Sequence, residues 1–404
     1  MLAVLLCAVL AGCAAPGARE ATPPTGPAIS ECCAAVQQRL AGFCTQRDIP
    51  GATCAFVLPD GRLGAVAVGV SSRTTGQAME PTNRMLAGSV GKTFVAAVLL
   101  QLHAEGRVDL DEKISHWLGQ EAWFARLPNG PGITLRMLLN HTSGLEEYYP
   151  MEGFINAVSA DLQRAWQPGE RIAYILDRPA LFPAGQGWSY ADTNFLLVGM
   201  IIEKVTGRTY YEELTRRILR PRDLQDTIPS DRNPLPGLVS GYTTPDHPFP
   251  VPAEITKDGF VAMNPQMEWT GGGVLSNAPD LARWARMLYA GDVLPPAERT
   301  LMLAGVPTQR WPNVDYGLGV LIRRTPHGIV YGHSGWFPGY ITMMGWYAGH
   351  ELALAVQFNS DVGMSSEALS GLTDDLAGVL LAKLSGLTAQ QRAALRAADG
   401  GLGQ

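Results

Sequence analysis

The segment 90–102 constrains the fold of this chain more than any other stretch of its sequence. It reads VGKTFVAAVLLQL, is apolar on nearly every face, and is followed shortly afterwards by Gly106. A helix that is apolar all round is buried on all sides, and glycine is common just beyond a helix end. The segment therefore predicts a helix inside the protein, with other elements packed around it.

Ser89 and Lys92 stand at the start of this segment, three positions apart. Residues at that spacing share one face of a helix, so we expect the hydroxyl and the amine within reach of each other. Burial disfavours a charged ammonium, and the resulting lower pKa would let Lys92 take the proton of Ser89. The N–H groups at the helix N-terminus would stabilise an oxyanion there. Ser-x-x-Lys is a weak pattern alone, and the apolar setting strengthens it because an unpartnered buried lysine is costly.

Two other motifs overlap the same residues, and neither fits. A phosphate-binding loop needs a glycine five positions before Gly91, where this chain has Leu86. The nucleophile elbow of α/β-hydrolases needs a glycine two positions before the serine, where this chain has Ala87. The serine–lysine interpretation therefore stands.

The composition is that of a globular enzyme. The 404 residues suffice for one large domain or two closely packed lobes, and hydrophobic and charged residues make up 46% and 17% of them. A net charge of -6 gives no reason to expect binding to nucleic acid or electrostatic docking on anionic lipid. We expect small or neutral partners, and the sequence does not predict an oligomeric state.

Residues 1–13, MLAVLLCAVLAGC, predict a secretory signal, being apolar and too short to span a bilayer, although no lysine or arginine precedes the run. Leu10 to Cys13 resembles the bacterial lipobox, in which the cysteine is lipidated, and in that pattern Ala14 is typical of proteins sent to the outer membrane. Residues 14–29 predict a flexible tether. We therefore expect a lipid-anchored protein of the bacterial cell envelope that faces the periplasm. A simple cleaved signal peptide is the alternative.

Four further cysteines precede the central helix: Cys32, Cys33, Cys44 and Cys54. In an exported protein we expect some of them to be oxidised, and three pairings are possible. The adjacent Cys32 and Cys33 are less suited to bond to each other than to the other two. A zinc site is less expected, because the Cys-x-x-Cys spacing and a nearby histidine are both missing.

Strand-like patterns stand at both ends of the chain, and the middle is rich in helices and loops. The expected strands are 51–58, 63–70, 317–322, 328–331, 340–346 and 352–357, and the expected helices beside the central one are 31–46, 195–205 and 366–384. This order predicts one antiparallel sheet assembled from the two ends, with a helical insertion between them.

Two more groups of residues are candidates for the same site. Tyr190 and Asp192 precede the apolar helix 195–205, so a loop-to-helix junction would hold the phenol rigidly. The structural alternative is that Tyr190 only packs and that Asp192 caps the helix, for which aspartate is well suited. His333 and Gly335 lie on an expected strand, where a glycine lets a substrate backbone approach. His333 could equally be an ordinary half-buried histidine.

In their order and spacing these motifs resemble the serine β-lactamase and penicillin-binding protein superfamily, especially class C β-lactamases, D-alanyl-D-alanine carboxypeptidases and related esterases. The resemblance covers about residues 45–385. Its three main motifs, Ser-x-x-Lys, Tyr-x-Asn and Lys-Thr-Gly, correspond to Ser89–Lys92, Tyr190–Asp192 and His333–Gly335. Accessory stretches of the family match at 138–145, 271–276 and 316–319.

The resemblance implies an α+β or α/β fold of the β-lactamase/transpeptidase-like type. An antiparallel sheet flanked by helices would pack beside a mostly helical lobe, with the site in the groove between them. The sheet lobe would take residues 30–110 and 310–387, the helical lobe 111–309, and the C-terminal tail 388–404. The resemblance implies no metal and no cofactor.

The resemblance also assigns catalytic roles. Ser89 would be the nucleophile, Lys92 its proton acceptor, and Tyr190 a partner in proton transfer to the leaving group. The backbone N–H groups of Ser89 and Trp336 would form the oxyanion hole. On the substrate-binding strand, His333 would replace the family's lysine and be followed by Ser334 and Gly335.

Asp192 departs from the family pattern, which has asparagine there. The asparagine amide holds the lysine and donates a hydrogen bond to the substrate carbonyl. An ionised carboxylate cannot donate, and its charge favours a protonated Lys92 unless Asp192 is itself protonated or turns away as a helix cap. His333 resembles a variant of some carboxypeptidases and esterases. Both features count against efficient β-lactam hydrolysis.

The sequence therefore predicts an extracytoplasmic serine hydrolase that forms an acyl-enzyme on Ser89. We expect a D-alanyl-D-alanine carboxypeptidase-like enzyme that acts on a small-molecule or peptidoglycan-peptide substrate. A carboxylesterase and a class C-like β-lactamase are alternatives with the same chemistry. A catalytically silent lipoprotein that binds peptidoglycan is the alternative of another class, with Asp192 as the sign of lost activity.

Overall fold

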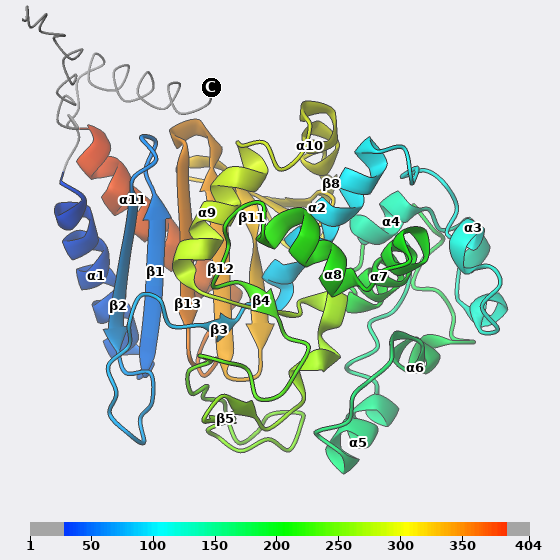
Figure 1. The fold of residues 1–404 in the computed structure, drawn as a ribbon, viewed down its shortest axis with the longest axis horizontal. Helices are drawn as coiled ribbons and strands as arrows, with labels where there is room; N and C mark the ends of the chain where they lie inside the picture. Colours follow the sequence, from blue (N-terminus) through cyan, green and yellow to red (C-terminus); the bar gives the residue numbers. More distant parts are fainter. Residues whose placement is uncertain (1–27, 386–404) are drawn as a thin grey trace, which may run out of the picture.

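The computed structural model describes residues 28–385, and its central element is an eight-stranded antiparallel sheet (Figure 1). The strands lie in the order β2-β1-β13-β12-β11-β10-β9-β8. Their bounds are Gly51–Val57 (β1), Leu63–Gly69 (β2), Val306–Pro307 (β8), Val314–Tyr316 (β9), Leu321–Thr325 (β10), Gly328–Phe337 (β11), Tyr340–Tyr347 (β12) and Leu352–Phe358 (β13). Because β1 pairs with β13, with Cys54 opposite Val356, the two ends of the chain meet inside one sheet.

The sheet matches the predicted fold class, and most predicted strands have observed counterparts. The expected strand at 317–322 is wrong in its first part. Gly317 N–H donates to Val320 O at 2.8 Å, and this tight turn separates β9 from β10. Gly319 has a φ of +71° and lies against the Lys92 carbonyl, where a side chain would collide. The turn therefore packs on the central helix, a long-range contact that the local apolar pattern does not reveal.

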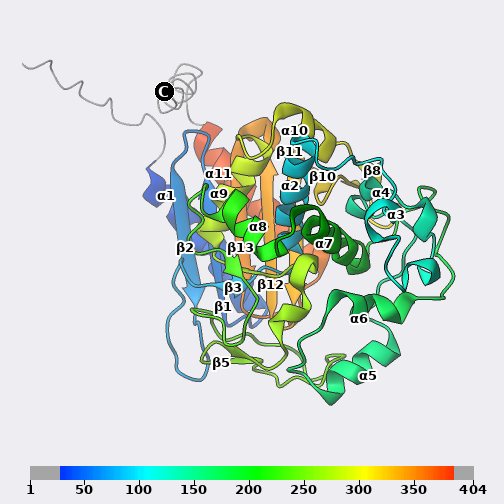
Figure 2. The same cartoon turned by 45° about the vertical axis from the view of Figure 1, so that its right-hand side comes forward.

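Helices cover both faces of the sheet (Figures 1 and 2). Helices α1 (Ile29–Gln46) and α11 (Ser366–Ser385) pack on one face, and α9 (Ala278–Tyr289) packs on β1, β12 and β13 from the other. The region 111–309, expected to form the helical lobe, therefore also supplies a helix to the sheet.

The helical side of the molecule consists of short helices around one longer one. These are α3 (Ser115–Leu118), α4 (Leu135–Leu139), α5 (Glu152–Ala160), α6 (Pro168–Ile172), α7 (Asp192–Thr206) and α8 (Tyr210–Leu214), with α10 (Pro296–Met302) beside the sheet. Two small sheets complete the fold: β3 (Met85–Leu86), β7 (Val274–Ser276) and β4 (Ile228–Pro229) form one, and β5 (Thr256–Lys257) and β6 (Phe260–Val261) the other.

The predicted central helix is α2 (Gly91–Ala104), and it lies between the sheet and the helical side (Figure 2). All of its residues from Gly91 to Leu100 are buried, as the sequence predicted. It contacts α7, α8, α10 and β11, so no face of its first turns is left to solvent. Apolar burial on every side is worth about 25 cal/mol per Å² and fixes the position of this helix.

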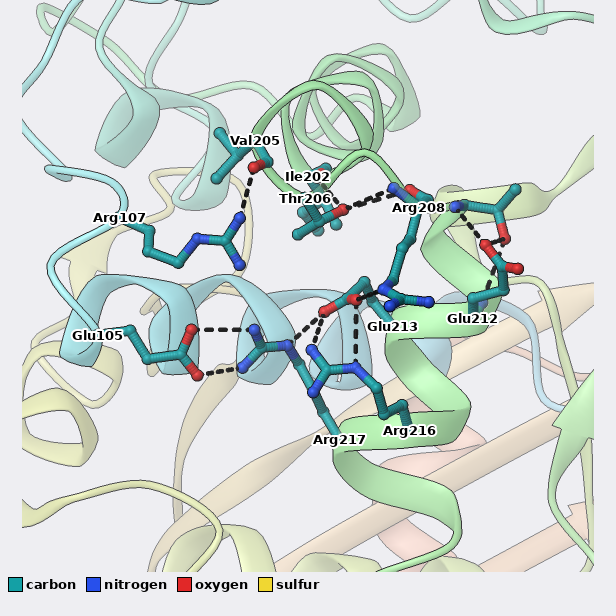
Figure 3. A network of polar contacts seen from close by, with 11 residues as sticks. Glu105, Arg107, Ile202, Val205, Thr206, Arg208, Glu212, Glu213, Arg216 and Arg217 are labelled. Carbon is teal, nitrogen blue, oxygen red and sulfur yellow. Dashed lines mark hydrogen bonds and ion pairs between the residues drawn. The ribbon is translucent and has the colours of Figure 1, made fainter.

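A network of charged side chains ties the C-terminal end of α2 to α8 (Figure 3). Glu213 of α8 has a side chain only 1% exposed, and it accepts hydrogen bonds from Arg217 at 2.5 Å and Arg216 at 2.7 Å. Arg217 also reaches Glu105, the residue that ends α2, at 2.5 Å. The network is built on a π-helical turn, Thr215–Leu219, which carries both arginines on the side of Glu213.

The four cysteines are free thiols, so the expectation that some are oxidised is wrong for this structure. Cys32 and Cys44 of α1 and Cys54 of β1 are buried in one apolar cluster, where burial raises the pKa of each thiol. They act there as small apolar side chains.

The predicted signal, the tether through residue 27, the lipidated Cys13 and the tail from residue 388 lie outside the described residues. Within residues 28–385, no helix is long and apolar enough to cross a membrane.

Replacing Glu213 with alanine should lower the free energy of unfolding by about 2–4 kcal/mol, because it leaves the buried guanidinium of Arg217 without one acceptor. Arg217 keeps Glu105 in this variant, which holds the loss below that of a fully orphaned charge. Glu212→Ala is the matched control. Its exposed carboxylate accepts from Thr209 N–H at 2.8 Å, so a clearly smaller loss of stability is expected. Urea unfolding followed by circular dichroism measures both, and equal losses would contradict the role given to Glu213.

Candidate active site

Ser89 and Lys92 face each other at the start of the buried helix. Ser89 lies in the 3-10 turn Gly88–Val90, and Lys92 in the first turn of α2. Lys92 Nζ donates to Ser89 Oγ at 3.0 Å, and the lysine side chain is fully buried. The structure thus brings the two residues together as the sequence predicted.

Lys92 has two further partners, from two other elements. Its Nζ lies 2.5 Å from Asp192 Oδ1 and 2.5 Å from the carbonyl oxygen of Gly271. An ammonium has three N–H groups and no acceptor, so three oxygen partners satisfy the charged form completely. The rings of Tyr190 and Phe195, at 4.9 and 5.4 Å, close the remaining space around the charge.

The expectation of a lowered pKa for Lys92 is wrong. Burial does lower it, but the negative charge of Asp192 and the other groups near the ammonium outweigh burial, and the pKa of Lys92 is raised above its usual value. Lys92 is therefore an ammonium in the resting protein.

Asp192 does not cap its helix, so that structural alternative is also wrong. Helix α7 begins at Asp192 itself, Ala191 is the N-cap, and the Asp192 carboxylate turns to Lys92. The Asp192 backbone N–H donates instead to Glu147 Oε2 at 2.5 Å. The position that is asparagine in the family thus holds a charged partner for the lysine.

Two half-buried glutamates beside Asp192, Glu147 and Glu268, were not predicted. Burial, and then the charge of Asp192, raise the pKa of Glu147 well above its usual range. The same two causes raise the pKa of Glu268 to about 8. Glu268 Oε2 is buried and has no hydrogen-bond partner among residues 28–385. A neutral carboxyl group can remain without a hydrogen-bond partner at a lower cost than a carboxylate. A cation placed beside it would favour loss of its proton.

Tyr190 lies over the lysine, and its hydroxyl is buried. Burial raises the pKa of the phenol well above its usual value, so Tyr190 is protonated at rest. Its ring packs against that of His141, with centroids 4.3 Å apart and the ring planes tilted by 36°. His141 Nδ1 accepts from Ala191 N–H at 3.2 Å and faces Asn194 Nδ2 at 3.0 Å. His141 thereby positions the segment that carries Tyr190; the sequence analysis included it only within the stretch 138–145.

The third motif lies on β11, and its histidine is uncharged. His333 is buried, with Nε2 2.9 Å from the Tyr316 hydroxyl and Nδ1 2.5 Å from the Ser334 carbonyl oxygen. Burial, and then the charge of Lys92, lower the pKa of His333 to about 3. His333 therefore occupies the place of the family's lysine without supplying its positive charge.

Two glycines let β11 pack directly against the turn that carries Ser89. A Cβ at Gly335 would lie 1.9 Å from Ala87 O, and one at Gly88 would lie 2.5 Å from Trp336 N. Gly88 also has a φ of +53°, which favours glycine. This close approach sets the Trp336 backbone beside Ser89, the arrangement that the predicted oxyanion hole requires.

Cavities open on both sides of Ser89. The larger, of about 350 Å³, is lined by Tyr190, Arg310, Ser334 and Trp336. The smaller, of about 170 Å³, is lined by Asp192 and Glu268 and by apolar side chains, among them Phe249 and Met263. Within the described part of the chain, no group of three or more histidine, cysteine, aspartate or glutamate residues could hold a metal ion.

Comparison with known proteins agrees with this geometry. The family model described as Beta-lactamase matches residues 34–389. The chain belongs to this family. It is 28% identical to Penicillin-binding protein 4* of Bacillus subtilis over 68% of this chain, and 28% identical to a D-aminopeptidase of Brucella anthropi over 79%. It spans only 60% and 58% of the length of these two relatives.

A solved structure resembles the chain over almost its whole length. It is the D-stereospecific amidohydrolase from Streptomyces sp., with a TM-score of 0.73 and 30% identity over 88% of this chain and 99% of that one. These relatives are hydrolases of the serine β-lactamase family, and this chain is a serine hydrolase of the same family.

Replacing Ser89 with alanine should abolish formation of a covalent acyl-enzyme and reduce turnover by at least about 10³-fold, since the nucleophile is lost. Labelling with a fluorescent penicillin and intact-protein mass spectrometry after addition of an activated ester measure the adduct. Ser115→Ala, an exposed serine at the start of α3, is the control. An adduct that persists in the Ser89 variant would rule this residue out as the nucleophile.

Proposed function

We propose that this protein is a serine amidohydrolase that cleaves amides or short peptides whose acyl part carries a free ammonium group. The observation that carries the proposal is the cavity of about 170 Å³ beside Ser89. It combines apolar walls with two acidic groups, Asp192 and Glu268, and one oxygen of Glu268 is buried without a hydrogen-bond partner in the described part of the chain. An amino-acid acyl group fits this chemistry: its side chain meets the walls, and its ammonium meets the carboxyl groups.

An incoming ammonium would also change the state of the base. Lys92 is charged at rest because the negative charge of Asp192 holds its proton. A second cation beside Asp192 shares that charge and repels the ammonium of Lys92, so the pKa of Lys92 falls when substrate binds. Binding of the correct substrate thereby favours the neutral amine that can deprotonate Ser89.

The chemistry then follows from the contacts. The neutral Lys92 takes the proton of Ser89, and Ser89 Oγ bonds to the substrate carbonyl carbon. The negative oxygen faces the backbone N–H groups of Ser89 and Trp336. The carbon–nitrogen bond breaks, and the leaving amine receives a proton through Lys92 or the Tyr190 hydroxyl. The neutral amine of Lys92 then deprotonates a water molecule. This water hydrolyses the ester on Ser89 and restores the enzyme.

The names of the relatives support this choice, since a D-aminopeptidase and a D-stereospecific amidohydrolase are among them. A D-alanyl-D-alanine carboxypeptidase is the second candidate. It is supported by the penicillin-binding protein relative and by Arg310, a cation suited to a substrate carboxylate in the larger cavity. Its substrates carry an acylated nitrogen where the first proposal requires a free amine, and this difference separates the two. An esterase would use the same Ser89 acylation.

The cellular location remains a proposal based on the sequence. The lipobox-like Leu10 to Cys13 supports a lipid-anchored, extracytoplasmic protein. Expression with and without Cys13→Ser, followed by membrane fractionation and metabolic labelling with palmitate, tests it. Label that is incorporated equally in both forms would contradict lipidation at Cys13.

Hydrolysis of D-alaninamide and of N-acetyl-D-alaninamide separates the two candidate functions. The proposal predicts a kcat/KM at least about tenfold higher for the free amine, with Glu268→Gln reducing that preference because a hydrogen bond between charged groups is worth about 1.5–3 kcal/mol. Glu112→Gln, an exposed glutamate away from both cavities, is the control. A preference for the acetylated substrate would favour the carboxypeptidase.

Asp192→Asn should shift the pH dependence of acylation to lower pH. Acylation needs the neutral form of Lys92, so its rate rises with pH towards a pKa that Asp192 holds up; removing the charge lowers that pKa. With a neutral activated ester, such as p-nitrophenyl acetate, the midpoint should fall by more than about one pH unit. Stopped-flow burst kinetics between pH 6 and 11 measure it, and an unmoved midpoint would contradict the account of Asp192.

A further inference from the structure

A third cavity lies next to the larger of the two beside Ser89, on the α11 face of the sheet. Its volume is about 310 Å³, and its apolar lining includes Leu321 of β10, Met343 of β12 and Leu369 of α11. Helix α11 packs on β13, which leaves the β10 end of this face open beside the helix. The two cavities share five lining residues: Trp311, Leu321, Ser334, Ser366 and Leu369. The groove at Ser89 and this cavity are therefore neighbours with shared walls.

Under the proposed function, this cavity lies on the side of Ser89 from which the leaving group would depart. Asp192 and Glu268, which attract the acyl ammonium, line the cavity on the other side of Ser89. The hydroxyl of Ser334 lines this side, and Tyr190 stands at the boundary, lining the cavities on both sides of Ser89. A leaving amine needs a proton donor beside it, and these hydroxyls lie where it would emerge.

Arg310 supplies positive charge at the rim. It is exposed, it lines the larger cavity, and its guanidinium lies 5.5 Å from the centre of the Trp311 ring. Among residues 28–385, no ion pair or hydrogen bond of its side chain is found. Two further arginines, Arg323 and Arg324, line the neighbouring apolar cavity. Both are already paired, Arg323 with Asp374 at 3.5 Å and Arg324 with Asp315 at 2.5 Å. Because His333 is neutral, Arg310 is the cation in this part of the described structure that is available to a substrate carboxylate.

We propose that the cavity is a leaving-group subsite for an apolar amino acid, and that Arg310 binds the free carboxylate of that residue. The inference rests on the proposed function, since it assumes acylation of Ser89 by the residue on the other side. In that step the peptide C–N bond breaks, the nitrogen of the leaving residue gains a proton, and a free amino acid departs. The smallest substrate that fills both sides is a dipeptide with a free ammonium and an apolar, carboxylate-bearing second residue.

The test compares leaving groups on one acyl group. We expect kcat/KM for D-alanylleucine to exceed that for D-alanylglycine at least about tenfold, because burying a leucine side chain is worth that factor or more. D-alanylleucine should exceed D-alanylleucinamide by a similar factor, because only the acid offers Arg310 a charge partner. Both stereoisomers of the leucine are tested.

Two variants separate the parts of the subsite. Arg310→Gln should reduce kcat/KM about tenfold more for D-alanylleucine than for its amide. Arg220→Gln, which removes an exposed arginine that lines neither cavity, should keep the wild-type ratio. Ser370→Phe places a ring in the apolar cavity and should reduce the preference for leucine over glycine.

Equal kcat/KM values for leucine and glycine in the wild-type enzyme, or an Arg310→Gln effect of the same size on acid and amide, would overturn the proposal. The same leaving groups are also tested on an N-acetyl-D-alanyl acyl group. This second series separates a failure of the subsite proposal from a failure of the proposed function. If only the acetylated compounds are hydrolysed, the free-amine proposal fails, and the leaving-group ratios still support or overturn the subsite.

Discussion

The ion pair between the fully buried Lys92 and Asp192 is the interaction on which the rest of the structure depends. Three elements supply the oxygen partners of Lys92: the turn at Ser89, the start of α7, and the loop at Gly271. Removing any one of them would leave an ammonium short of a partner in an apolar interior, which costs several kcal/mol. The charge therefore joins the sheet side and the helical side of the molecule at the point where chemistry occurs.

The same ion pair makes the resting site inactive as a base. Lys92 holds its proton, Tyr190 is a neutral phenol, and His333 is a neutral imidazole. None of these three side chains can therefore deprotonate Ser89 until the charge around Asp192 changes. Under the proposed function, a substrate that carries its own cation would do so, which would link recognition of the amine to activation of the nucleophile. Asp192 then has a function that asparagine at this position could not have.

Much of the fold follows from local patterns in the sequence. The all-round apolar segment that became α2, the two N-terminal strands and the late strands are recognisable because each carries its own periodicity or apolar run. The turn at Gly317 was missed because its form is set by contact with α2. The free cysteines likewise follow from packing between α1 and β1, which spacing alone does not show.

In the site, Ser89, Lys92 and Tyr190 were found through motifs, whereas Glu147 and Glu268 carry no local signal, since distant segments create their burial. The predicted direction of the Lys92 pKa shift was wrong for the same reason, because the shift depends on the Asp192 carboxylate, one hundred positions away in the sequence.

The charge state of Lys92 tests this account most directly. Nuclear magnetic resonance of the protein labelled with ¹³C at the lysine ε-carbon, with Lys92→Arg used for assignment, reports the protonation of this one amine as pH is varied. The account predicts that Lys92 remains charged from neutral pH to above the usual lysine pKa in the free protein, and loses its proton at lower pH once an amine-bearing inhibitor occupies the cavity at Asp192 and Glu268. A Lys92 signal that is already neutral near pH 7 in the free protein would contradict it.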